Sequence, residues 1–160
     1  MIEIRHCLDS ELESAKGVSE QAFLCLREVY RPTPEAVQRQ RNMASDLKRL
    51  VAVDGSEVVG TVQYRLQVDR LHLLGLAVSP SRWRAGVARA LIERLYDLAL
   101  AHNCRRLSLY TIEQTGNVKV FEHLGFKVVE RGPAEGVVGV LGEPLSEAFM
   151  ERGVPALIPS

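Results

Sequence analysis

The sequence predicts an α/β protein in which a mixed sheet of about seven strands carries helices on both faces. Short segments whose apolar residues alternate or run together predict the strands, and three-and-four spacing of apolar residues predicts the helices. Residues 70–78 and the helix that starts at Val87 are the clearest pair, because a nearly continuous apolar run is typical of a strand covered on both faces. The predicted order is a strand, two helices, three strands, a helix, a strand, a helix and two strands.

The N-terminal part predicts one strand and two helices. Residues 2–6 alternate apolar and polar side chains, as in a strand with one buried face. Ser10 and Glu13 have the spacing of a capping box, so we expect the first helix to start near them. After a break, Thr33-Pro34 supplies a cap and a proline at the first helical position, and we expect the second helix to reach about Asp46.

The middle of the chain predicts a hairpin, a buried strand and a long helix. Residues 50–53 and 58–64 flank Asp54-Gly55, which is a compact hairpin signal. Ser79-Pro80-Ser81 ends the strand at residues 70–78. The long helix is predicted to bury one stripe, formed by Val87, Ala90, Leu91, Leu95, Leu98 and Ala99.

The C-terminal third predicts three strands and a short helix. Gly125 is expected to follow the helix as its left-handed C′ residue. In chain order we expect a strand at 106–111, the short helix at 117–123, a strand at 126–130, a loop or flexible hairpin connection at 132–143 and a last strand at 145–151.

Composition limits the class of protein. A length of 160 residues suits one domain, expected to span residues 1–160, and 46% hydrophobic with 25% charged residues is ordinary for a globular protein. Twenty basic and twenty acidic residues cancel, so composition gives no support for nucleic-acid or membrane partners. The first five residues are too charged and too short to open a signal peptide, and no apolar run approaches membrane-span length.

The cysteines agree with a cytoplasmic location. Cys7, Cys25 and Cys104 are odd in number and far apart, with no CxxC motif. We expect reduced, mostly packed thiols, neither a disulfide framework nor a metal site, although a catalytic cysteine is left open.

The turn before the long helix is suited to binding an anion. The first N–H groups of a helix have no intrahelical partner, and small residues such as Gly86 and Ala88 let a phosphate approach them. Arg82 and Arg84 would add positive charge. The alternative is an ordinary strand–loop–helix corner with solvated arginines. Neither the GxxxxGK[ST] nor the GxGxxG phosphate loop is present.

Two blocks of sequence together resemble a known family. The first is Leu76-Ala77-Val78-x-Pro80 followed by residues 86–91, GVARAL; the second is Thr115-Gly116-Asn117 followed by residues 121–126, FEHLGF. In this order and spacing they are similar to the acetyl-CoA pyrophosphate loop and the "xYExLGF" segment of the GCN5-related N-acetyltransferase (GNAT) superfamily. The blocks span roughly residues 70–126, and the order of elements agrees over nearly the whole chain.

The resemblance implies a mostly antiparallel sheet whose strands four and five, residues 70–78 and 106–111, are splayed. The fourth strand would carry a bulge, so that the pantetheine arm of acetyl-CoA lies in the gap. Gly75 fits this independently, since a glycine inside a strand often marks a bulge. The residues that would contact acetyl-CoA are Leu76, Ala77, Val78, Trp83, Arg84, Ala85, Gly86, Val87, Ala88, Arg89, Asn117 and Phe121.

Two positions depart from the family pattern. Trp83 stands three residues before the loop glycine, where the family usually has Gln or Arg. Since backbone donors do most of the phosphate binding, we expect the site to survive, with Trp83 covering the adenine side or packing on the surface. Phe121 stands where many members have a tyrosine that protonates the leaving thiolate, and Phe121 cannot donate a proton.

Direct acetyl transfer needs a base, because an alkyl amine is mostly protonated at neutral pH. His72 precedes Val78 by six residues, where one branch of the family has its glutamate base; the alternative is a strand histidine bonded to a neighbour. Glu113 is a second candidate base or a surface carboxylate. Tyr110 is a candidate replacement for the missing phenol, and a backbone N–H near Leu76 or Ala77 would meet the oxyanion.

The expected function is acetyl-CoA-dependent N-acetylation of an amine by direct transfer in a ternary complex. The acceptor is a small-molecule amine or a protein amine, and a homodimer is left open. Arginines of the first two helices would receive an anionic acceptor, or else form a solvated face: Arg27, Arg31, Arg39 and Arg41, beside Tyr30. The alternative function is a non-catalytic acyl-CoA-binding or sensor domain of the same fold. No metal site is expected.

Overall fold

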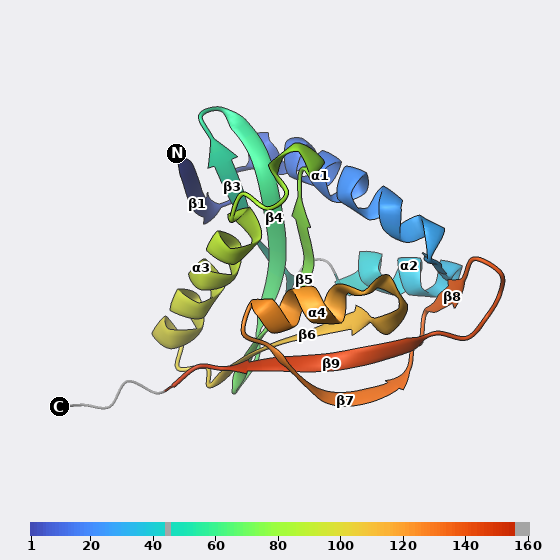
Figure 1. Ribbon diagram of the computed structural model, residues 1–160. Helices are drawn as coiled ribbons and strands as arrows, with labels where there is room; N and C mark the ends of the chain where they lie inside the picture. Colours follow the sequence, from blue (N-terminus) through green and yellow to red (C-terminus); the bar gives the residue numbers. More distant parts are fainter. Residues whose placement is uncertain (44–45, 156–160) are drawn as a thin grey trace.

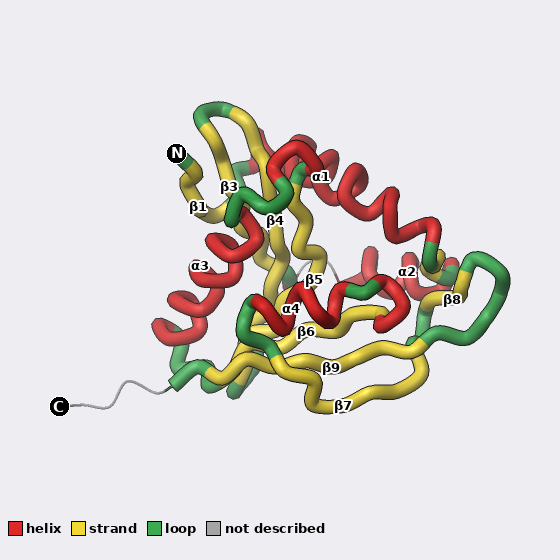
Figure 2. The backbone as a smooth tube through the Cα atoms, viewed as in Figure 1, coloured by secondary structure: helices red, strands yellow, loops and turns green. Residues whose placement is uncertain are grey.

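A seven-stranded sheet organises the protein (Figures 1 and 2). The computed structural model describes residues 1–43 and 46–155. In spatial order the strands are β1 (Ile2–His6), β3 (Lys48–Asp54), β4 (Glu57–Leu66), β5 (Arg70–Val78), β6 (Arg106–Ile112), β9 (Ser146–Gly153) and β7 (Lys127–Pro133). Neighbouring strands are antiparallel except for β5 and β6, which run parallel. The predicted mixed, mostly antiparallel sheet is therefore confirmed.

Helices cover both faces of the sheet, as predicted. The helices are α1 (Leu12–Leu24), α2 (Pro34–Met43), α3 (Val87–Ala101) and α4 (Asn117–His123). Short 3₁₀ turns are η1 (Asp9–Glu11), η2 (Cys25–Glu28), η4 (Pro80–Arg82) and η5 (Glu113–Thr115). Ala15 and Val18 of α1 pack against one face, whereas the buried stripe of α3 and Phe121 of α4 belong to the larger apolar cluster on the other face.

The stripe of α3 explains why this helix forms and where it lies. Leu91, Leu95 and Ala99 are fully buried, as their spacing predicts, and Ile92 is buried beside them. The helix also approaches β4 very closely, because a Cβ added at Gly60 would lie 2.7 Å from Val87 Cγ1. The first turn of α3 therefore packs directly on the β4 backbone.

A bulge interrupts β5 at Gly75. Thr61 of β4 pairs with Ala77, but Gln63 pairs with Leu74, so two residues of β5 stand opposite the single residue between Thr61 and Gln63. Gly75 has a φ of +66°, a left-handed conformation that costs glycine little. The bulge that the resemblance implied is present, at the residue that suggested it.

Strands β5 and β6 separate soon after they start. Their parallel pairing covers only the first three residues of each strand and ends at His72 opposite Ser108. Beyond that point β5 has β4 as its only described partner. The splay predicted for these two strands is confirmed.

The capping box of the first helix was assigned to the wrong residues. The N–H of Leu8 donates to Glu11 Oε1 over 3.0 Å, and the chain turns into η1 before α1 begins at Leu12. Glu11 is fixed there because its two oxygens also accept from Arg5 of β1, at 2.5 and 2.7 Å. The contact of Glu11 with strand β1 therefore determines which residues form the cap.

The second helix and the glycine-rich segment differ from expectation. The N–H of Ala36 donates to Thr33 Oγ1 over 3.2 Å, which confirms the predicted cap. Helix α2 is described to Met43, and its expected continuation includes residues 44–45, which lie outside the described residues.

Residues 132–143 are not simply a loop, because β8 (Val137–Gly139) pairs with β2 (Tyr30–Pro32) in a second small sheet. Short, distant strands of this kind carry no local pairing signal.

The cysteines are unpaired, and they differ in burial. Cys104 is buried, Cys7 is half-buried and Cys25 is exposed. Burial raises the pKa of the Cys104 and Cys7 thiols, which favours the inert thiol form. Within the described residues, no helix is both long enough and apolar enough to cross a bilayer.

Replacement of glycine by alanine should have opposite effects on stability at two positions, Gly60 and Gly17. Gly60→Ala should lower the free energy of unfolding by roughly 1–3 kcal/mol, because the methyl group would collide with Val87 at the start of α3. Gly17→Ala, in α1 with nothing within 4 Å, is the matched control and should raise stability by about 0.5–1 kcal/mol. Urea unfolding followed by circular dichroism measures both. An equally stable Gly60→Ala variant would contradict the close approach of α3.

Candidate functional site

The free edge of β5 faces the gap left by β6. The N–H of Ser79 donates to the Val59 carbonyl, which makes Val78 and Gly60 a non-hydrogen-bonded pair of the β4–β5 ladder. The N–H and C=O of Val78 therefore point away from β4, toward the gap, while Ala77 directs its own N–H and C=O to Thr61. A ligand with amide groups can lie along this edge as an added strand does.

The turn between β5 and α3 presents backbone donors at the end of this edge. The first intrahelical bond runs from the Ala90 N–H to the Gly86 carbonyl, so the four preceding N–H groups have no intrahelical partner. Arg84 and Gly86 have positive φ angles of 64° and 83°. Alternating right- and left-handed residues turn successive N–H groups to one side, and this geometry, with the helix dipole, binds anions.

One side chain of the turn, that of Arg82, differs from the expectation. Arg84 and Ala85 are exposed at the turn. Arg82, which was expected to add charge to the anion site, instead donates to Asp54 Oδ2 over 2.5 Å and to Glu57 Oε2 over 3.4 Å. Its charge is thus used to hold the turn to the β3–β4 hairpin, and the backbone donors carry the site.

Trp83 fixes the turn to the strand before it. Its indole N–H donates to the Val78 carbonyl over 2.8 Å, although about half of the side chain, 52%, is exposed. The carbonyl that accepts this bond is the one that faces the gap. Trp83 therefore has a structural role that differs from both expectations, which were that it covers the adenine or packs on the surface.

Helix α4 borders the gap from the α3 face of the sheet. Arg89 of α3 donates to the carbonyl of His123 over 3.0 Å, which joins the start of α3 to the end of α4. Phe121 packs edge-on against Phe126, with ring centroids 6.0 Å apart, and Asn117 opens the helix half-buried. The second sequence block therefore lies on the same face as the first turn of α3.

His72 and Tyr110 meet on the opposite face. Leu71, Leu73 and Leu109 belong to the cluster under α3, so the side chains between them in sequence project the other way. His72 Nδ1 lies 2.8 Å from Ser108 Oγ, and the His72 ring is 5.6 Å from the ring of Tyr110. Burial, reinforced by Arg65 and Arg70, lowers the pKa of His72 to about 4.

This arrangement restricts what the two residues can do. A pKa of about 4 keeps His72 neutral at physiological pH, with a lone pair available but weakly basic. Tyr110 lies on the face of the sheet away from Phe121, so it cannot take the same position as the tyrosine that Phe121 replaces. Both residues border the end of the β5–β6 pairing.

Glu113 lies apart from this pair. Its carboxylate accepts hydrogen bonds from Arg131 and from Ser146 Oγ, the latter at 2.6 Å. The Ser146 hydroxyl and the Arg131 guanidinium hold the pKa of Glu113 below its ordinary value. The geometry favours the surface carboxylate over the base, since Glu113 ties the end of β6 to β7 and β9.

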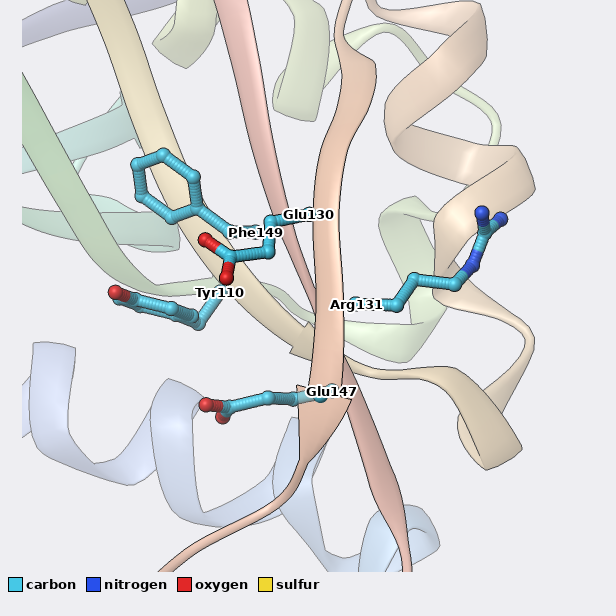
Figure 3. Close-up of a pocket in the computed structure, with 6 residues that line it drawn as sticks. Tyr110, Glu130, Arg131, Glu147 and Phe149 are labelled. Carbon is cyan, nitrogen blue, oxygen red and sulfur yellow. The ribbon is translucent and has the colours of Figure 1, made fainter.

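Two hollows flank Tyr110 and Phe149 on the His72 face. One, of about 240 Å³, is lined by Arg65, Gln67, Arg70, His72, Tyr110 and Phe149. The other, of about 170 Å³, is lined by Tyr110, Glu130, Arg131, Gly132, Glu147 and Phe149. Figure 3 shows the Glu130 and Glu147 side chains directed to the same side as Tyr110, and Arg131 directed away.

Sequence reasoning missed these acidic residues. The last strand was predicted, and Glu147 and Phe149 alternate there with the buried Ala148 and Met150. The alternation therefore indicates that Glu147 and Phe149 lie on the same face of the sheet. The pattern does not tell which face borders the gap. The arginines proposed for an anionic acceptor are mostly exposed. Arg27 lies over the Tyr30 ring at 5.3 Å, and its buried Nη1 has no partner among the described residues.

The comparisons with known proteins agree with this geometry. The model of the Acetyltransferase (GNAT) family matches residues 15–126. The structure is similar to that of the ribosomal-protein-S18-alanine N-acetyltransferase from Escherichia coli, with 17% identity, a TM-score of 0.76 and coverage of 100% of this chain and 97% of that chain. No curated protein gives a significant sequence match.

Two further solved structures have the same fold. A putative GNAT acetyltransferase from Desulfovibrio desulfuricans is 17% identical with a TM-score of 0.74, covering 97% of this chain and all of the other. An aminoglycoside 6′-N-acetyltransferase complexed with coenzyme A is 16% identical with a TM-score of 0.69, covering 98% and 99%. The splayed strands, the glycine turn and a family match over most of its length therefore establish that this chain belongs to the GNAT acetyltransferase family.

Proposed function

We propose that residues 1–160 form a single acetyltransferase domain that moves an acetyl group from acetyl-CoA to a primary amine. One observation carries the proposal: the free edge of β5 leads directly into the turn whose backbone N–H groups converge ahead of α3. A ligand with amide groups and a pyrophosphate, such as acetyl-CoA, matches both parts. The unpaired cysteines support action in the reducing cytoplasm.

The residues that would hold acetyl-CoA form three groups. The main chain of Leu76 and Val78 would bond the pantetheine amides, and the N–H groups around Arg84 to Ala88 would bind the pyrophosphate. Asn117 and Phe121 would flank the ligand from the α4 side. When bound, acetyl-CoA supplies a thioester carbonyl activated for attack by an amine.

The substrate nitrogen must lose two protons, and one negative charge must be stabilised. The ammonium group loses the first proton before attack, because only the neutral amine has a free lone pair. As the nitrogen bonds to the acetyl carbon the carbonyl oxygen gains charge, and as the carbon–sulfur bond breaks the nitrogen loses its second proton and the thiolate departs, to be protonated by solvent. Leu76 N–H is the better of the two proposed oxyanion donors, because Ala77 directs its N–H toward β4. His72, neutral and beside Tyr110, is the nearest candidate to receive the amine proton, directly or through water.

The rival proposal is an acyl-CoA-binding domain without catalysis. Phe121 supports it, because no phenol stands at that position to protonate the departing thiolate. We favour the enzyme, since a thiolate is an adequate leaving group and solvent can protonate it. Steady release of free coenzyme A thiol in the presence of an amine separates the two.

The first experiment measures binding. Acetyl-CoA and free coenzyme A at a hundred times their dissociation constants should stabilise the protein by about 2.7 kcal/mol, and should raise the melting temperature by several degrees. ATP and NAD serve as matched controls and should leave it unchanged. Trp83 is the only tryptophan and lies in the turn, so its fluorescence should change with the same two ligands. If neither coenzyme A form shifts either signal, the proposed function is wrong.

The low pKa of His72 predicts the pH dependence of turnover. Because that pKa is about 4, the proton is already lost well below neutrality, so kcat/KM should rise with pH as the amine deprotonates, without a bend near 6.5. His72→Ala should lower kcat roughly tenfold or more at each pH and leave acetyl-CoA affinity unchanged. Ser108→Ala, which removes only the hydrogen-bond partner, is the milder control. If the His72→Ala variant turns over at the wild-type rate, His72 is not the general base.

Restoring the phenol tests the leaving-group step. Phe121→Tyr keeps the ring that packs on Phe126 and adds one hydroxyl at a half-buried position. We expect kcat to change by less than about threefold, because protonation by solvent is not limiting for a thiolate. Single-turnover and steady-state rates of thiol release measure the effect. A tenfold rise would show that the missing acid limits the wild-type protein.

A further inference from the structure

The two hollows beside Tyr110 form adjoining halves of one groove with opposite charge. They share Tyr110 and Phe149, whose ring centroids are 4.9 Å apart. Arg65 and Arg70 lie in the half that contains His72, whereas Glu130 and Glu147 lie in the other half. A ligand in this groove would have one end beside the β5–β6 gap and the other between two carboxylates.

The acidic half lacks a counter-charge. Among the described residues, neither Glu130 nor Glu147 forms an ion pair, and Arg131, their neighbour in the wall, is directed away and bonded to Glu113 (Figure 3). Burial raises the pKa of Glu147, and the nearby Glu135 raises it further. Both carboxylates therefore line this half of the groove without an ion-pair partner among the described residues.

Aromatic rings make the same half suitable for a cation. Tyr110 and Phe149 line both halves, and the face of an aromatic ring attracts a positive charge. Phe149 already carries one such charge, because the Arg70 guanidinium carbon lies 5.3 Å from its ring centroid. Two carboxylates beside two aromatic rings are a suitable set of contacts for an ammonium group.

The basic half favours a neutral amine. The positive charges of Arg65 and Arg70 contribute to the low pKa of His72, and they would likewise oppose a protonated amine placed beside it. An amine at this end therefore loses its proton more easily than in water. The groove thus has a preferred direction for a molecule with two amino groups, with the charged one distal and the neutral one beside the gap.

We infer that the acceptor is a short diamine or a longer polyamine, whose distal ammonium group is held by Glu130 and Glu147 while the other nitrogen is acetylated. The inference rests on the proposed function. Glu147 stands on β9 and Glu130 on β7, one and two strands from Tyr110 on β6, so the distal ammonium group would lie about 5–10 Å from Tyr110 in the direction across the strands. The opposite class, an amine with a distal carboxylate, would use Arg65, whose buried Nε has no partner.

Three amines with four-carbon chains test the inference. Putrescine, butylamine and γ-aminobutyrate present a distal ammonium, a methyl and a carboxylate group, and thiol release gives kcat/KM for each. We expect putrescine to exceed butylamine at least tenfold, as one charge-assisted hydrogen bond can provide, and γ-aminobutyrate to be the poorest. Equal rates for putrescine and butylamine, or a preference for γ-aminobutyrate, would overturn the inference.

Two isosteric variants assign the effect to these carboxylates. Glu147→Gln and Glu130→Gln should each lower kcat/KM for putrescine at least fivefold and leave the value for butylamine within about twofold. Asp97→Asn is the matched control, because it removes the same charge from the exposed surface of α3. A loss that is equal for both amines would indicate general damage to the site and would contradict the assignment.

A binding measurement keeps the test independent of turnover. With coenzyme A present, putrescine should raise the melting temperature of the wild type more than butylamine does, and Glu130→Gln/Glu147→Gln should abolish the difference. If coenzyme A binds and butylamine is acetylated but putrescine has no advantage in either assay, only the acceptor inference fails. If coenzyme A itself does not bind, the proposed function fails first.

Discussion

The bulge at Gly75 is the constraint on which the arrangement of the site depends. Before it, Leu71 and Leu73 face α3 and His72 faces the opposite side; after it, Leu76 and Val78 face α3 and Ala77 the opposite side. One inserted residue, stable at a φ of +66° because it is glycine, reverses this alternation within a single strand. The strand can therefore place His72 on the face opposite α3 and still bury Val78 beneath α3. It also leaves β6 after His72, so that the edge beyond the bulge is free.

The turn after β5 depends on that free edge. Its donors are useful only if they lie in line with the edge, and three contacts hold them there. Trp83 bonds to the Val78 carbonyl, Arg82 bonds to Asp54 on the β3–β4 hairpin, and Val87 rests on the β4 backbone at Gly60. These contacts lie outside the groups that would touch a phosphate. These contacts would therefore preorganise the proposed binding geometry, which lowers the entropy cost of binding a ligand.

The sequence indicated what local patterns can encode, and it missed what distant partners decide. The stripe of α3, the hairpin around Gly55 and the bulge at Gly75 follow from spacing and from glycine conformation, and all are present. The strand Val137–Gly139 was missed because its partner, Tyr30–Pro32, is a hundred residues away and equally short. For a related reason the sequence did not predict the ion pairs of Arg82 and Glu113, although a surface carboxylate was one of the two alternatives for Glu113. A charged side chain has the same appearance in a sequence whether it faces a ligand or an ion-pair partner, and each of these two is bonded to a neighbour.

The two faces of the sheet would divide the proposed chemistry, and this division would make Phe121 compatible with catalysis. Phe121 packs with the apolar cluster on the α3 face of the sheet, whereas His72 and Tyr110 lie on the opposite face. In the proposed reaction the amine and its departing proton would lie on the His72 face, where the arginines disfavour a cation. The thiolate would leave along the pantetheine, toward the face of α4. An acid at residue 121 would act only on the leaving group, and its absence does not affect how the groove selects, orients or deprotonates the amine. In the proposed reaction, selection and proton removal would therefore rest on residues that the family pattern does not specify, Glu130, Glu147 and the surroundings of His72.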